Sequence, residues 1–149
     1  REAASWVIFF SMANSAARRE VLERLPFVSR VQYSEDIEWS YRLRLAGLEI
    51  RYVADAAATH SHNYTLRQSY KRHFGEGKAE AWIFRQGEIS SSLLRYALLP
   101  FGMEVLRDLK WALSRGSLDA VLHTVPLRAV QKWGRWRGLR EGQRVYALV

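Results

Sequence analysis

The sequence contains no cysteine, which excludes a disulfide framework and thiolate metal ligands. No apolar run is long enough to cross a bilayer, and the first residues, Arg1 to Ala4, do not form a signal peptide. Acidic residues are scarce, since 15 Asp and Glu stand against 23 Lys and Arg, and the net charge is +8. This balance favours an anionic partner, such as nucleic acid, a membrane surface or a phosphorylated substrate.

The composition is that of a globular protein, because 48% of the 149 residues are hydrophobic and 26% are charged. Short apolar or alternating runs predict extended strands, and runs with helical spacing predict helices. Thr65 and Gln68 have the spacing of a capping box, which marks a helix start. The expected strands are 6–10, 49–53 and 56–60, and the expected helices are 16–22, 35–46, a helix from 65 weakened by Gly75 and Gly77, 93–113 and 118–132.

The stretch from Tyr33 to Trp39, Tyr-Ser-Glu-Asp-Ile-Glu-Trp, lies at the expected start of the second helix. The Ser34 hydroxyl is expected to accept a hydrogen bond from a first-turn amide, and the helix dipole favours ionised Glu35 and Asp36. A rigid, charged carboxylate suits a base that takes a proton from an attacking alcohol. Taken alone, the stretch is better explained as ordinary helix-start chemistry.

His60 and His62 lie two positions apart, where the last expected strand runs into a loop. On an extended chain such residues point the same way, roughly 7 Å apart. Neutral imidazole is a common ligand of divalent metals, but two histidines make an incomplete site. From these residues alone, a pair of surface histidines is the favoured interpretation.

Further side chains are candidates for contact with a ligand. Asn14 and Arg18 lie at an expected strand-to-helix turn, where free helix amides and side chains converge. Lys71 and Arg72 are candidates for holding a phosphate group, and a solvated helix face is an equally good explanation. Trp39 is suited to stack on a sugar face or to anchor the core, and the second is slightly favoured.

The order of these pieces is more specific than any one of them. Asn-Ser-Ala-x-Arg-Arg is followed by Pro-Phe, by Glu-Asp-Ile-Glu-Trp and by Ala-x-x-His-Ser-His-Asn-Tyr-Thr-Leu. From about Phe9 to Phe84 this resembles the C-terminal half of a family 2 glycosyltransferase with the GT-A fold, and it is similar to the rhamnosyltransferase-like members that build bacterial surface polysaccharide. The resemblance implies an α/β fold, with residues 1–87 as the acceptor-side half of the transferase domain. Residues 88–149 lie outside the specific resemblance, and their spacing of apolar residues predicts an amphipathic helical tail.

Members of this family transfer a sugar from a nucleotide diphosphate donor to an acceptor hydroxyl, with inversion at the anomeric carbon. The resemblance implies that Asp36 is the catalytic base and Glu35 its companion. It also implies that His60 or His62 completes the coordination of Mg²⁺ or Mn²⁺ at the donor diphosphate, where the metal is a Lewis acid for the leaving group. The weaker implied contacts are Asn14 and Arg18 for substrate, Lys71 and Arg72 for the diphosphate, and Trp39 and Arg42 for the acceptor or for support of the Glu-Asp helix.

One departure from the family pattern is clear. The family carries an Asp-x-Asp metal motif in an N-terminal nucleotide-binding half, and no Asp-x-Asp occurs in this sequence. Because the chain also begins at Arg1 rather than Met, we expect a fragment without the donor-binding half, inactive in isolation. The implied partners are a nucleotide sugar and a saccharide or lipid-linked acceptor, in the cytoplasm or at the inner face of the cell membrane.

Two alternatives without catalysis remain open. A nucleic-acid-binding module gains from the positive charge and from Trp133 and Trp136 among arginines, but no motif of that class is present and nucleic acid is not the expected partner. A membrane-surface element gains from the same basic, tryptophan-bearing end, Lys132 to Gly138. Packing of the tail on its own domain explains that segment at least as well.

Overall fold

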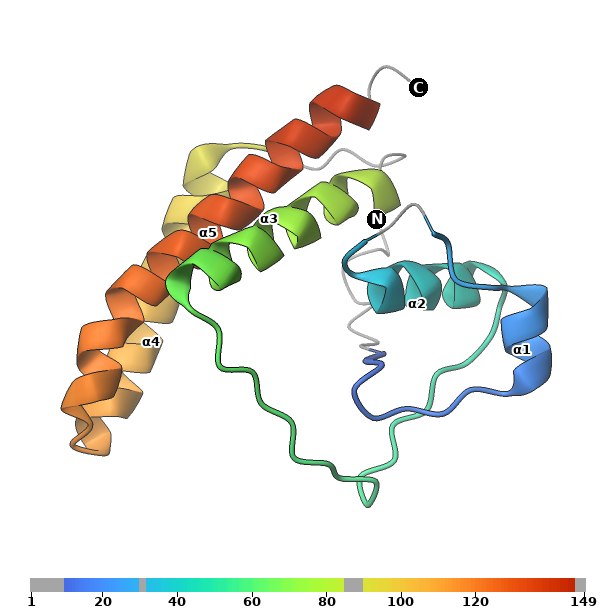
Figure 1. Cartoon of the computed structure of the whole chain (residues 1–149), viewed down its shortest axis with the longest axis horizontal. Coiled ribbons are helices and arrows are strands. Elements are labelled where there is room, and N and C mark those ends of the chain that lie inside the picture. The colour runs from blue at the N-terminus through green and yellow to red at the C-terminus, as the bar shows by residue number, and fades with distance from the viewer. Residues whose placement is uncertain (1–9, 30–31, 85–89, 147–149) are drawn as a thin grey trace. The chain divides into compact units, whose positions relative to one another are not determined.

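The computed structural model describes residues 10–29, 32–84 and 90–146 (Figure 1). The chain folds as two compact units, residues 1–62 and 63–149. Within the described residues every regular element is a helix. These are α1 (Arg19–Arg24), α2 (Glu35–Leu45), α3 (Leu66–Ile83), the π-helical turn η2 (Leu94–Leu98), α4 (Leu99–Ser114) and α5 (Leu118–Tyr146).

The expected α/β fold, with a GT-A half-domain, is therefore wrong. Residues 49–53 and 56–60 form neither strand nor helix, and the expected strand 6–10 lies almost wholly outside the described residues. A strand persists only where a neighbour pairs with its backbone N–H and C=O groups, and the described parts of the chain contain no such ladder. Alternation of side chains predicts an extended backbone, but it does not supply the partner that makes a sheet.

The first unit is organised around Trp39 on α2, whose side chain is 1% exposed. The indole lies 5.0 Å from the Phe10 ring and 5.1 Å from the Phe27 ring, and its N–H donates to the Leu25 carbonyl at 2.6 Å. Leu43, one turn further along, is also buried. Helical spacing predicts that Ile37, Tyr41 and Leu45 of this helix face the core, and this prediction is wrong for Leu45, which is 70% exposed.

The second unit begins with the capping box at the start of α3, as expected from the sequence. The Thr65 hydroxyl accepts a hydrogen bond from the backbone N–H of Gln68 at 3.3 Å, and Oε1 of Gln68 accepts one from the backbone N–H of Thr65 at 2.9 Å. Gly75 and Gly77, which were expected to weaken this helix, do not interrupt it, because α3 is continuous to Ile83. A glycine is required at position 77 for another reason: a Cβ there would lie 2.0 Å from the carbonyl oxygen of Arg135.

Helix α5 continues well past the expected end at Lys132 and runs parallel to α3 (Figure 1). Its glycines at positions 134, 138 and 142 meet Tyr70, Phe74 and Lys78 of α3 in that order. The two backbones approach so closely because none of these glycines carries a Cβ. Trp136 and Gly138 are buried in this unit. The basic and tryptophan-bearing end is therefore largely an interhelical contact rather than an open patch.

Helix α4 follows directly after the π-helical turn η2. It packs antiparallel to α5, which also contacts α3. Ion pairs join the two helices, since Glu104 contacts Lys132 at 2.5 Å and Asp108 contacts Arg128 at 2.6 Å. Among the described helices, none is long and apolar enough to cross a membrane. The boundary expected after residue 87 falls among residues 85–89, outside the described part, and stays a prediction.

Candidate functional site

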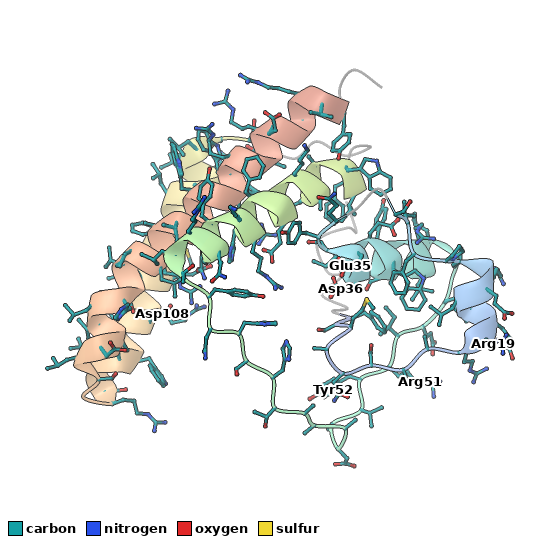
Figure 2. The ribbon with its side chains drawn as sticks, viewed as in Figure 1. Arg19, Glu35, Asp36, Arg51, Tyr52 and Asp108 are labelled. Atoms are coloured by element: carbon teal, nitrogen blue, oxygen red, sulfur yellow. The ribbon has the colours of Figure 1, made fainter. Side chains whose placement is uncertain are left out.

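The Glu-Asp pair occupies the first turn of α2, and both side chains are half-buried (Figure 2). Oδ1 of Asp36 accepts a hydrogen bond from the Ile37 amide at 2.9 Å. The expected hydroxyl cap by Ser34 is wrong, because its side chain makes no capping bond and its backbone lies in the left-handed region, at φ 60° and ψ 29°. That conformation costs a non-glycine residue about 1–2 kcal/mol. The Asp36 carboxylate thus takes the amide that the serine was expected to hold.

A buried ion pair fixes α2 directly behind the Glu-Asp pair. Glu38 is only 3% exposed, and its carboxylate receives two hydrogen bonds from Arg42, at 2.6 and 2.9 Å. Arg42 also donates to the Pro26 carbonyl at 2.7 Å. Sequence reasoning missed Glu38 as a structural residue, although its spacing of four from Arg42 signals a helical ion pair. Together with the buried Trp39, this arrangement holds the start of α2 to the segment before it.

Asn14 and Arg18 lie in the segment that leads into α1, and no strand precedes that helix within residues 10–18. The Asn14 amide donates to the Ala56 carbonyl at 2.7 Å and so joins two distant loops of the first unit. Asn14 and Ser15 have side chains that suit a helix cap, and the sequence predicts that one of them caps the following helix. This prediction is wrong, because Arg18 is the N-cap of α1 and makes no side-chain capping bond. The Arg18 side chain is exposed.

His60 and His62 are exposed and in contact with each other. Their Nε2 atoms are 2.7 Å apart, with the rings edge to face at a centroid distance of 4.3 Å. One ring must donate and the other accept, so at least one of them is neutral. No group of three or more metal-ligating side chains forms within the described residues, and Mg²⁺ prefers oxygen ligands. The described residues alone therefore do not fit a complete site for this metal.

Lys71 and Arg72 belong to the second unit, on α3. Lys71 is exposed. Arg72 donates to Glu76 at 2.9 Å and to the Tyr64 hydroxyl at 2.8 Å, and its guanidinium lies 5.5 Å from the centre of the Tyr64 ring. Partial burial would lower the pKa of Arg72, but its hydrogen bonds to Glu76 and Tyr64 outweigh burial and raise it. The other expected site residues all lie in the first unit.

Comparison with known proteins gives two curated relatives. The chain is 40% identical over 82 residues to the O-antigen chain rhamnosyltransferase WbaN of Salmonella anatum, and 37% identical over 82 residues to the O-antigen chain rhamnosyltransferase RfbN of Salmonella typhimurium strain LT2. Each match covers 52% of this chain and 26% of the relative, so the match spans about a quarter of the relatives' length. No family model and no solved structure matches the chain. The two matches support a relationship to glycosyltransferases.

Proposed function

We propose that this chain is part of a glycosyltransferase that acts in O-antigen or related surface polysaccharide synthesis. The observation that supports this most strongly is the 37–40% identity to two rhamnosyltransferases. By analogy with those relatives, the proposed donor is a nucleotide diphosphate sugar with rhamnose as the transferred group, and the proposed acceptor is a saccharide hydroxyl.

The proposed base is Asp36. Its carboxylate sits in the first turn of α2, and one oxygen is held by the Ile37 amide. In the proposed step the carboxylate takes the proton of the acceptor hydroxyl as that oxygen bonds to the anomeric carbon. The bond from this carbon to the diphosphate breaks at the same time, so the configuration inverts. Glu35, beside it on the same turn, is the proposed companion.

The contacts made by the next turn of α2 hold the base in a fixed position. Trp39 and the Glu38–Arg42 pair tie α2 to the Leu25 and Pro26 carbonyls, and reaction rates depend steeply on such positioning. A divalent metal at His60 or His62 stays a prediction from the family resemblance, and no step of the proposed reaction is routed through it.

The test is Asp36→Asn in the full-length protein, assayed for transfer from a nucleotide diphosphate-rhamnose to a saccharide acceptor. Because a positioned base contributes about 10²–10⁴-fold, we expect a loss of at least about 100-fold in kcat. Asp55→Asn is the matched control, since Asp55 is an exposed aspartate of the same unit, and it should retain the wild-type rate. Circular dichroism checks that both variants fold. If Asp36→Asn keeps near-normal activity, the assignment of the base is wrong.

A further inference from the structure

Helix α4 turns both of its carboxylates toward α5. Glu104 pairs with Lys132 at 2.5 Å and lies 3.2 Å from Arg128, and Asp108 accepts from Arg128 at 2.7 Å (Figure 2 marks Asp108). These contacts place both carboxylates on the side of α4 that faces α5. A helix at the surface of a soluble protein normally has the opposite arrangement, with apolar residues inward and charges outward.

The opposite side of α4 is apolar and exposed. Leu99, Met103, Leu106 and Leu113 are between 53% and 72% exposed, and their spacing places them on one helix face. Lys110 occupies the remaining position of this face and is also exposed. We call these five residues the α4 stripe. An exposed, mainly apolar stripe of this kind marks a surface that another phase or molecule covers.

The charge around the α4 stripe indicates what covers it. Residues 90–146 contain ten Lys and Arg against four Asp and Glu. Exposed Arg107 follows Leu106 directly, and Arg115 caps the end of α4, where its guanidinium lies 5.8 Å from the centre of the exposed Trp111 ring. Exposed apolar residues together with lysine, arginine and tryptophan are the composition of a helix that lies in a membrane interface.

We propose that the α4 stripe docks into the surface of an anionic bilayer, with the leucines in the acyl region and the basic side chains at the headgroups. The cytoplasmic leaflet carries such a negative surface potential. A second copy of the chain is a poorer occupant, because pairing two stripes would bury Lys110 in an apolar interface, whereas a lysine beside lipid can extend its ammonium to the headgroups. This docking does not depend on the proposed transferase activity.

The experiment uses the absence of cysteine, since any introduced cysteine is the sole labelling site. The full chain with Leu106→Cys carries an environment-sensitive fluorophore, and Tyr52→Cys, at a highly exposed aromatic position of the first unit, is the matched control. Both are titrated with vesicles of equal parts phosphatidylglycerol and phosphatidylcholine. We expect a blue shift at position 106 and an aqueous spectrum at position 52.

Two further measurements separate the proposal from its alternatives. Each basic residue near an anionic surface strengthens binding by roughly fivefold, and Arg107, Lys110 and Arg115 are three such residues on α4 or at its end. Pure phosphatidylcholine vesicles should therefore bind about 100-fold more weakly. Leu106→Asp should remove binding to the anionic vesicles while circular dichroism shows the helices intact. An aqueous spectrum at position 106 with anionic vesicles overturns the proposal. A blue shift without vesicles that grows with protein concentration also overturns it and assigns the α4 stripe to a second copy.

Discussion

The close approach of α3 and α5 is best tested at Gly138. A Cβ at this position would lie 1.9 Å from the Phe74 carbonyl oxygen and 2.8 Å from the Phe74 carbonyl carbon. Both atoms belong to the backbone, so no side chain can turn aside, and the two helices would have to separate. Overpacking of this kind typically costs about 1–3 kcal/mol, and the backbone clash places Gly138→Ala at the upper end.

The gain in helix propensity offsets part of this cost. Replacing glycine by alanine in a helix interior stabilises by about 1 kcal/mol, so the net loss for Gly138→Ala is about 2 kcal/mol. For a unit of this size, 1 kcal/mol shifts Tm by about 4–8 °C, and the variant should melt about 10 °C lower. Thermal and urea unfolding followed by circular dichroism at 222 nm measure the change.

Gly102 supplies the matched control. It lies inside α4, and a Cβ there would meet nothing within 4 Å. Gly102→Ala should therefore show the propensity gain alone, with Tm raised by about 4–8 °C. The two substitutions are chemically identical and are expected to act in opposite directions. If Gly138→Ala also raises Tm, α3 and α5 do not approach as closely as the structure shows.

Two further outcomes follow from the ion pairs. Arg42→Ala leaves the buried Glu38 carboxylate without its cation and should lower the free energy of unfolding of the first unit by about 2 kcal/mol, measured by urea unfolding. This value is smaller than the loss for a fully buried ion pair, because Arg42 is partly exposed to solvent. The control is Arg44→Ala at an exposed position, which should change the stability little. Burial would raise the pKa of Asp108, but hydrogen bonds from Arg128 and Arg107 lower it below its ordinary 3.8. The unfolded chain then binds more protons than the folded chain in acid, so the free energy of unfolding of the second unit should fall as pH drops below about 4. Urea unfolding at a series of pH values measures this for the wild type and for Asp108→Asn. An equal slope of stability against pH in the two proteins would contradict the prediction.

Local sequence patterns predict the structure correctly where residues within one helical turn decide the backbone conformation. The capping box at Thr65 and Gln68 closes within one turn, so its spacing predicts the start of α3 directly. The Glu-Asp pair falls in the first turn of α2, as its position after a polar segment indicates. The prediction failed for Ser34, because the left-handed backbone at that residue turns its hydroxyl away from the cap and Asp36 takes the amide instead.

The sequence by itself therefore predicted a helix in each region where α1 to α5 lie, the start of several of them, and the large positive charge. Only the tertiary structure decided that no sheet forms in the described residues and that α5 continues past Lys132, where glycines 134, 138 and 142 bring it close to α3. It also decided that the carboxylates of α4 face α5. The physical reason is that hydrogen bonds within a helix depend on residues three or four apart, whereas burial depends on partners far along the chain. A periodic stripe of leucines shows that a helix has two faces, and the ion pairs with α5 decide which of the two is left open.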